Sequence, residues 1–209
     1  DAGLVSRLVD RTGNGNDFVQ ASVGSQPDII ADVINGHSAI RFDAANREVM
    51  AYAGQFPALS TESYVKLMVV NLPAPGTTAN LLSGNVPSAG RHSLYGAGNS
   101  SAVSHESNTS GPLRAESFVD SWHLIIAEFN AITGEHVLLV DNGVAQTKVV
   151  TPADRNADLL MGAADSSGNG AATMDVAEVM ILDQPVISNA DNLAMIQRYV
   201  AGKYGLALI

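Results

Sequence analysis

The stretch that decides the fold reads WHLIIAEF at residues 122–129 and continues as HVLLVD at residues 136–141. Both runs are apolar and of strand length, and residues 130–134 between them include the glycine of a turn. Asn142-Gly143 follows at once, a dipeptide that favours the left-handed turns of tight hairpins, and residues 146–150 supply a third strand. The sequence therefore predicts three successive antiparallel strands in this part of the chain.

Shorter strands are predicted outward from this hairpin. Residues 39–43 alternate apolar and polar side chains, as a half-buried strand does, and residues 48–53 are their expected partner. Residues 64–70 are rich in β-branched and apolar side chains and end before Pro73. Four further short strands are predicted, at residues 81–84, 93–96, 158–162 and 176–182. Strands at this spacing indicate an all-β chain, an antiparallel two-sheet jelly-roll sandwich forming a single domain over residues 1–209.

One helix is predicted, at residues 188–204. Ser188 is its expected N-cap, Asp191 lies in the first turn, where a carboxylate favours the positive helix end, and Gly205 is the expected stop. The apolar side chains that recur at helical spacing are Leu193, Ile196, Tyr199 and Val200. This apolar stripe is expected to cover an open end or an edge of the sandwich.

The composition narrows the classes of partner. The chain has 21 acidic and 11 basic residues, a formal net charge of −10, and no basic run, which argues against nucleic acid and against anionic membranes. Its apolar runs are too short for membrane insertion, which needs about 20 residues. The absence of cysteine excludes disulfides, thiol catalysis and iron–sulfur clusters. Because the sequence begins at Asp1, we expect a mature form or an excised domain.

Motifs along nearly the whole chain resemble one superfamily. They are DRTGNGND at 10–17, QP at 26–27, NG at 35–36, AIRFD at 39–43, SWHL at 121–124, VDNG at 140–143, DVAEVMILD at 175–183 and YVAGKYGL at 199–206. In this order they resemble the concanavalin A-like lectin/glucanase superfamily, and within it the laminin-G-like domains of secreted bacterial and phage virion proteins. Leu8 departs from the pattern, which often has an aromatic there. The resemblance implies a jelly roll with a closing helix, a fold that carries lectins, hydrolases and structural modules alike.

Glycosidase chemistry is disfavoured. The laminarinase-like hydrolases of the superfamily carry two carboxylates in an E-x-D-x-x-E strand, and retaining hydrolysis needs the two about 5–5.5 Å apart. Here Thr173 takes the place of the first Glu, and Asp175 and Glu178 point to opposite faces of a regular strand. We therefore predict no enzyme, and a structural role for Glu178, hydrogen-bonded near the helix or a loop.

Two loops resemble half of a calcium loop. Asp10 is followed by Thr12 and Asn14, and Asp165 by Ser167 and Asn169, each set ending in a glycine. Oxygen ligands at alternate positions suit Ca²⁺, but both loops lack the bidentate Glu at the twelfth position. We interpret both as Asx-type turns, with calcium as the alternative and no other cofactor or metal site expected.

The candidate binding site lies in a Gly- and Ser-rich segment. It holds His92, Tyr95, His105 and Asn108, which are interpreted as exposed loop or groove residues, with Tyr95 as the stacking surface for a sugar. A lyase base among His92, Tyr95 and His105 is the weaker alternative, because the rest of a lyase pattern is missing. Trp122 is predicted to be buried core, and residues 165–170 are the second choice for the binding site.

These features predict a non-catalytic binding or adhesion module on an exterior surface, extracellular or on a virion. Its expected partner is a glycan or a surface protein, since a surface poor in charge and rich in Asn, Ser, Thr and Gly suits hydrogen bonding to hydroxyl groups. The alternative is a structural or decoration protein of a virion or another extracellular assembly, in which the chain would be a homo-oligomer or a virion component.

Overall fold

The computed structural model describes residues 3–52, 63–73, 79–84, 92–97, 102–106, 113–115, 121–150 and 159–208. Within these residues the strands form two sheets in which every pair is antiparallel. In spatial order the eight-stranded sheet contains β1 (Arg7–Leu8), β2 (Phe18–Val19), β5 (Met50–Tyr52), β14 (Leu159–Met161), β7 (Ala79–Gly84), β8 (Ser93–Ala97), β9 (Ala102–Glu106) and β10 (Leu113–Ala115). The seven-stranded sheet contains β13 (Gln146–Val149), β12 (Glu135–Val140), β11 (Trp122–Asn130), β6 (Tyr64–Asn71), β15 (Met174–Leu182), β4 (His37–Phe42) and β3 (Asp28–Ile34).

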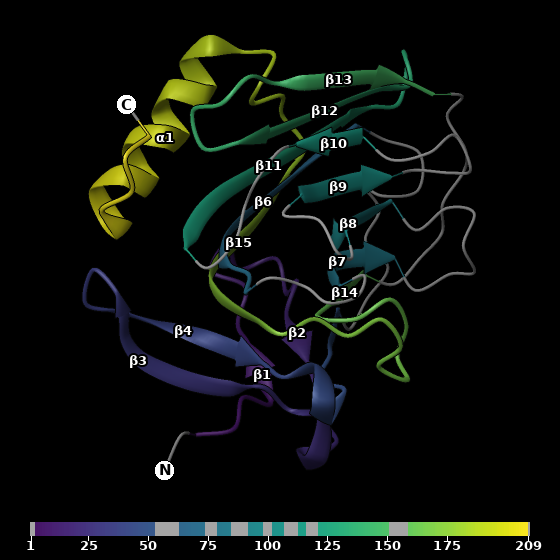
Figure 1. Ribbon diagram of the computed structural model, residues 1–209, viewed down its shortest axis with the longest axis vertical. Helices are drawn as coiled ribbons and strands as arrows, with labels where there is room; N and C mark the ends of the chain where they lie inside the picture. Colours follow the sequence, from purple (N-terminus) through teal and green to yellow (C-terminus); the bar gives the residue numbers. More distant parts are fainter. Residues whose placement is uncertain are drawn as a thin grey trace.

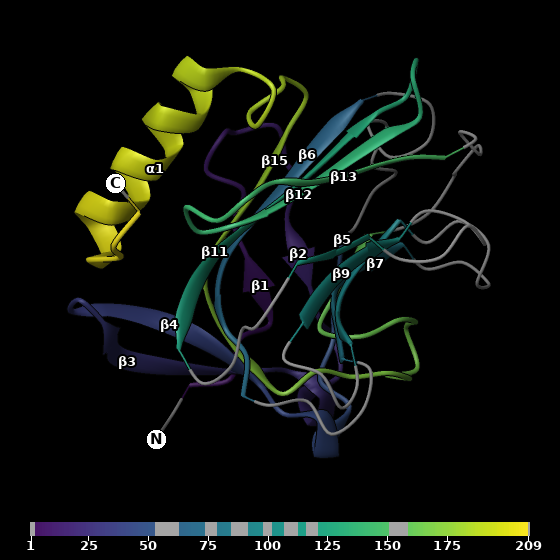
Figure 2. The ribbon, with the colours of Figure 1, turned by 45° about the horizontal axis from the view of Figure 1, so that its top comes forward.

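The chain also forms two single-turn 3-10 helices, η1 (Val23–Ser25) and η2 (Ala44–Asn46), and one long helix, α1 (Ala190–Tyr204). Figure 1 shows α1 beside β11, β12 and β15, and Figure 2 shows the three layers in the order helix, seven-stranded sheet, eight-stranded sheet. The predicted sandwich with one C-terminal helix is confirmed. Within the described part of the chain, no helix is long and apolar enough to cross a membrane.

The strand β6 shows why the seven-stranded sheet lies in the middle. Its side chains alternate between two clusters: Tyr64 and Met68 face the core between the sheets, whereas Val65, Leu67 and Val69 face the layer beneath α1. A strand buried on both faces reads as a continuous apolar run, as residues 64–70 do apart from Lys66. The face of this sheet, and not an open end or an edge as expected, is therefore what α1 covers, because Ile196 and Val200 pack against Val65 and Leu67 in one cluster.

A β-bulge in β15 changes which side chains share a face. Met174 and Val176 belong to the core between the sheets, and the pairing with β6 then shifts between Val176 and Glu178. Beyond the shift, Val179 continues toward the core and Glu178 toward α1. The prediction that Asp175 and Glu178 point to opposite faces is wrong, because the extra residue of a bulge reverses the alternation.

The N-cap of the helix lies one residue later than predicted. Asn189, not Ser188, is the N-cap, and its Oδ1 accepts hydrogen bonds from the N–H groups of Asp191 and Asn192. The hydroxyl of Ser188 instead donates to Glu128. Gly205 ends the helix in the left-handed conformation, as predicted.

Strand existence was predicted better than strand pairing. The hairpin of β11 and β12 is confirmed, with Asn130 opposite Glu135, and β12 pairs with β13 as expected. The predicted pairing of residues 48–53 with residues 39–43 is wrong, since β5 lies in the eight-stranded sheet between β2 and β14. Five strands were not predicted: β1, β2, β3, β9 and β10.

Candidate functional site

The outer face of the eight-stranded sheet carries one of the four predicted site residues. Leu94 on β8 and Leu82 on β7 point into the core, so their neighbours Tyr95 and Ser83 point outward. Tyr95 lies opposite Asn80 of β7 and is half-buried. We call Asn80, Ser83 and Tyr95, with the adjoining loop 165–170, the Tyr95 face.

Hydrogen bonds fix the loop 165–170 to the sheet. The backbone N–H and the side-chain Nδ2 of Asn80 both donate to the carbonyl of Gly170 at 3.0 Å. The hydroxyl of Ser83 donates to Asn80 Oδ1 at 3.1 Å, and both side chains are buried. The second-choice binding loop therefore lies directly against the strand that pairs with Tyr95, so the two predicted locations belong to one face.

The carboxylate of Asp165 is used within its own loop. Its Oδ1 accepts hydrogen bonds from the N–H groups of Ser167 and Asn169 at 2.9 and 3.1 Å, and its Oδ2 accepts from Asn169 Nδ2. Asp10 does the same for Thr12 and Asn16, and the N–H of Thr12 is the main reason that the pKa of Asp10 is lowered. The Asx-turn interpretation is confirmed for both loops.

A search of the described residues for three or more His, Asp or Glu side chains that could hold a metal finds none. The carboxylates of Asp10 and Asp165 accept N–H groups of their own loops.

The structure does not bring the four predicted residues together. His92 is buried, with 2% of its surface exposed, so its expected exposure is wrong. It precedes β8 with a φ of 45°, and its ring lies in the interior while Tyr95 lies outside. His105 lies on β9, opposite Leu94, which places it on a strand and not in a loop. Asn108 lies outside the described residues.

His92 belongs to a buried polar and aromatic cluster that the sequence analysis missed. The cluster comprises Tyr64 and Lys66 of β6, His92, Phe129 of β11 and His136 of β12. The Nδ1 of His92 hydrogen-bonds to the hydroxyl of Tyr64, and the ring centroids of His92 and Phe129 are 4.9 Å apart. The cluster links the two sheets across the core. A lone Lys in the run YVKLMVV was the signal available in the sequence.

Burial shifts the pKa values of two members of this cluster. Lys66 is fully buried, with its ammonium donating to the carbonyls of Leu82 and His92, and desolvation lowers its pKa to about 7. Burial, aided by the charges of Lys66 and Lys148, lowers the pKa of His136 to about 4. The cluster is therefore held together mainly by uncharged contacts above pH 7.

We expect Lys66→Met to remove a pH dependence of stability. Because the pKa of Lys66 is about 7 in the folded chain and near 10.5 in the unfolded chain, the unfolded state binds more protons between these values. Stability should thus rise with pH, by about 2 kcal/mol between pH 7 and pH 9. Urea denaturation at the two pH values checks this. Lys148→Met, at a half-buried site, should keep the rise, and an equal rise in Lys66→Met would refute the assignment.

Trp122 is half-buried, whereas the sequence analysis placed it in the core. As the first residue of β11 it shares a face with Leu124 and Ile126 and packs on the cluster beneath α1. The physical reason for its partial exposure is its place at the strand end, where that layer is not fully covered.

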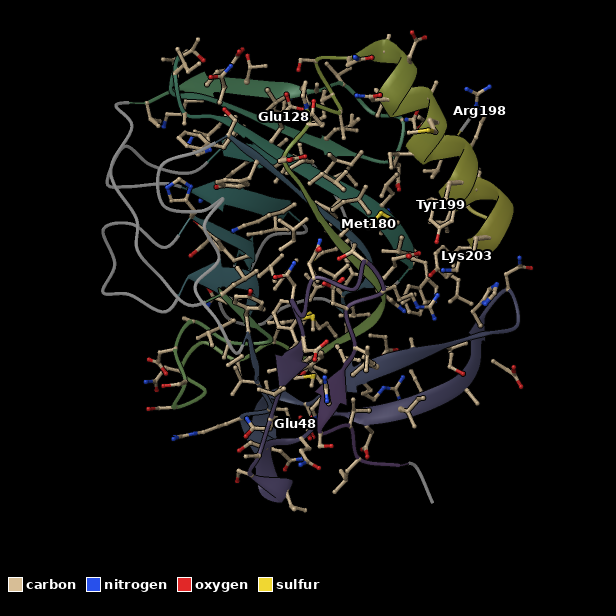
Figure 3. The ribbon with its side chains drawn as sticks, turned by 180° about the vertical axis from the view of Figure 1, so that it is seen from behind. Glu48, Glu128, Met180, Arg198, Tyr199 and Lys203 are labelled. Carbon is tan, nitrogen blue, oxygen red and sulfur yellow. The ribbon has the colours of Figure 1, made fainter. Side chains whose placement is uncertain are left out.

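Glu178 anchors α1, as predicted for a structural carboxylate. Figure 3 shows Tyr199 and Lys203 on the helix near Met180 of β15. Glu178 accepts hydrogen bonds from the hydroxyls of Tyr199 and Tyr204 and from Lys203 Nζ, at 2.7 to 3.0 Å. Burial raises the pKa of Tyr204 to about 12. Burial alone would lower the pKa of Lys203, but hydrogen bonds with Tyr199, Tyr204 and Glu178 outweigh it, so the pKa is raised.

Asp175, the other carboxylate of the strand, forms a two-bond ion pair with Arg41, with both contacts at 2.7 Å. Both carboxylates therefore have structural partners, and the arrangement is not that of a free acid and a free nucleophile.

No protein-family model and no curated protein matches this chain. Solved structures do match in fold. A Trypanosoma rangeli sialidase has a TM-score of 0.62 and 13% identity, covering 93% of this chain and 32% of its own. The binding domain of botulinum neurotoxin DC in complex with SialylT has a TM-score of 0.58 and 9% identity, and the match covers 92% of this chain and 50% of the neurotoxin chain.

A third match is a complete small module. The CBM40 of a Ruminococcus gnavus sialidase, bound to α2,3-sialyllactose, has a TM-score of 0.54 and 12% identity, covering 67% of this chain and 85% of its own. This chain spans about a third of the length of the sialidases that it matches. At these identities the likeness shows the fold alone, a two-sheet jelly-roll sandwich.

Proposed function

We propose that this chain is a glycan-recognising binding module that acts on an exterior surface through the Tyr95 face. The observation that carries the proposal is the position of Tyr95 on the outer face of a rigid sheet, next to the loop that Asn80 holds. A rigid sheet and a hydrogen-bonded loop lose little entropy on binding. The likeness to a CBM40 that binds sialyllactose supports the same reading.

The chemistry of this face suits a sugar. A tyrosine ring offers an apolar face to sugar C–H groups, and Asn169 and Asp165 add polar groups at the loop. The chain carries a net charge of −10, which repels acidic glycans, so neutral glycans are the favoured class. Glycoside hydrolysis is not part of the proposal, since Asp175 and Glu178 are bound to structural partners.

We expect Tyr95→Ala to weaken glycan binding about tenfold or more, because a contact at the centre of a site is worth more than about 1 kcal/mol. A glycan array selects the ligand, with neutral oligosaccharides beside sialyllactose, and calorimetry measures the affinity. Tyr95→Phe should retain most of the affinity, since it keeps the ring. Tyr199→Ala, which removes an exposed tyrosine from α1, is the matched control and should bind as the wild type does.

Native mass spectrometry and thermal stability accompany these variants. A folded wild type that binds no glycan on the array would overturn the proposal. If that protein is also oligomeric, and Tyr95→Ala breaks the oligomer, the face serves assembly into a virion or another extracellular structure instead.

A further inference from the structure

Two of the motifs in the sequence, residues 121–124 and 140–143, meet in the structure. There Ser121, His123 and Asp141 form a chain of hydrogen bonds, which we call the Ser121 relay. The hydroxyl oxygen of Ser121 lies 2.7 Å from Nε2 of His123, and Nδ1 of the same ring lies 2.6 Å from Oδ2 of Asp141. A carboxylate on Nδ1 fixes the tautomer in which Nδ1 carries the proton and Nε2 carries a lone pair. The lone pair therefore faces the hydroxyl of Ser121, which is the arrangement of a nucleophile, a base and a positioning acid.

The surroundings hold this relay in place. Asp141 Oδ1 accepts the N–H of Leu124 at 2.8 Å, and the Asp141 N–H donates to the Leu124 carbonyl at 2.8 Å. Gln197 of α1 donates to the carbonyl of Asp141 at 3.2 Å. His123 is paired along β11 with β6, so its ring starts from a fixed backbone. Two sheet strands and the helix thus restrain the base and the acid.

Ser121 itself is exposed and comes directly before β11, so a reagent can reach it. A purely structural contact between His123 and Asp141 would tie β11 to the end of β12 without any hydroxyl on Nε2. The contact between the Ser121 hydroxyl and Nε2 of His123, the nitrogen that can accept a proton, is what distinguishes a reactive serine from a structural contact.

We propose that Ser121 is an activated nucleophile that accepts the acyl group of a small, exposed ester and passes it to water. Nε2 of His123 takes the hydroxyl proton as the oxygen of Ser121 bonds to the ester carbonyl carbon. The carbon–oxygen bond to the alcohol then breaks, and the alcohol leaves with the proton from Nε2. Water repeats the sequence on the acyl-serine, releases the carboxylic acid and restores the hydroxyl. This activity is separate from binding at the Tyr95 face.

The reaction is expected to be slow. Stabilisation of the oxyanion is usually the largest part of catalysis by such sites, and one lost donor costs about 100- to 1,000-fold. A site open to water at the end of a sandwich gains little from a low dielectric constant. Activated esters and fluorophosphonates, which need little oxyanion stabilisation, are therefore the appropriate probes.

The test is covalent labelling of the full chain with a fluorophosphonate, followed by peptide mass mapping. We expect one label, on Ser121, forming at least tenfold faster than on any other serine, and release of p-nitrophenol from p-nitrophenyl acetate with a burst. Ser121→Ala should abolish both, and His123→Ala should slow labelling at least tenfold. Ser38→Ala, which changes an exposed serine of β4, should leave both unchanged.

Asp141→Asn tests the positioning role. Asparagine keeps an acceptor for the Leu124 N–H, so the fold should persist, but labelling should slow and the low-field proton resonance of a carboxylate-bound imidazole N–H should disappear. Labelling that is equally fast in folded Ser121→Ala, or unaffected in folded His123→Ala, would overturn the proposal. Loss of glycan binding in Tyr95→Ala would be irrelevant to this outcome, so the two proposals can fail separately.

Discussion

Gly162→Ala is expected to lower the free energy of unfolding by about 2–6 kcal/mol, the sum of backbone strain and overpacking. Gly162 follows β14 with a φ of 96°, which a residue with a side chain rarely adopts. A Cβ atom there would lie 2.5 Å from a ring carbon of Phe42 and 2.9 Å from the carbonyl oxygen of Glu48. The backbone of Gly162 is held in this position, because its N–H donates to the carbonyl of Leu81 and its own carbonyl accepts the N–H of Ala172.

Gly13→Ala is the matched control for this substitution. Gly13 also has a positive φ, of 81°, but a Cβ atom there would meet nothing within 4 Å. The control should therefore lose only the backbone strain of a left-handed residue with a Cβ, about 1–2 kcal/mol. Equilibrium urea denaturation measures both. Equal losses in the two variants would mean that Phe42 and Glu48 move aside and that the close packing at Gly162 contributes nothing.

The sequence predicted the central strands well because their signal is local. The run WHLIIAEF is apolar on both faces, and β11 is indeed buried between the two sheets' core and the layer beneath α1. The turn after β12 lies where Asn142-Gly143 predicts one, but the expected left-handed geometry of that dipeptide is wrong: the residue with a positive φ is Asp141, at 54°, and the N–H of Gly143 closes the turn on the carbonyl of Val140. Where two paired strands are joined by a short turn, the sequence is sufficient to predict their pairing.

Pairing between distant strands could not be predicted in this way. β5 lies between β2 and β14, although the chain order suggested β4, and no local feature of Met50–Tyr52 selects those partners. The bulge at Val176 and Glu178 depends on how β15 fits β6 along its length. Ser188 lost the N-cap position for a similar reason, since a distant carboxylate, Glu128, binds its hydroxyl.

The candidate binding site was predicted only in part, because local alternation can be seen in the sequence and contacts between distant residues cannot. Strand alternation next to Leu94, which the sequence contains, turns the half-buried Tyr95 to the outer face of the sheet. His92 instead enters the core, because its backbone turns left-handed before β8. Residues 93–96 were predicted as a strand and lie in β8, whereas residues 102–106, where the Gly- and Ser-rich composition suggested a loop, pair with it as β9. The contact of His123 with Asp141 joins residues 18 positions apart and follows from the hairpin register.

Glu128→Ala is expected to lower the free energy of unfolding by about 2–6 kcal/mol. Glu128 is buried on the helix side of β11, and its Oε2 accepts the N–H groups of Val186 and Ile187 at 2.9 and 2.8 Å. Its Oε1 accepts the hydroxyl of Ser188 at 2.6 Å, so one carboxylate holds the segment that leads into α1 (Figure 3). Alanine would leave two backbone donors without their acceptor, and each such buried group costs about 1–3 kcal/mol.

Because the contacts of Glu128 precede the first turn of α1, the loss should loosen the helix before the sheets. Amide hydrogen exchange should rise in α1 more than in β6, and urea denaturation should report the free energy. Glu135→Ala on the neighbouring strand removes a half-buried carboxylate of the same size and should cost less than about 1 kcal/mol. Ser188→Ala removes one of the three donors and should cost about 1 kcal/mol. If Glu128→Ala costs no more than Glu135→Ala, water replaces the carboxylate and apolar packing beneath Ile196 and Val200 alone docks the helix.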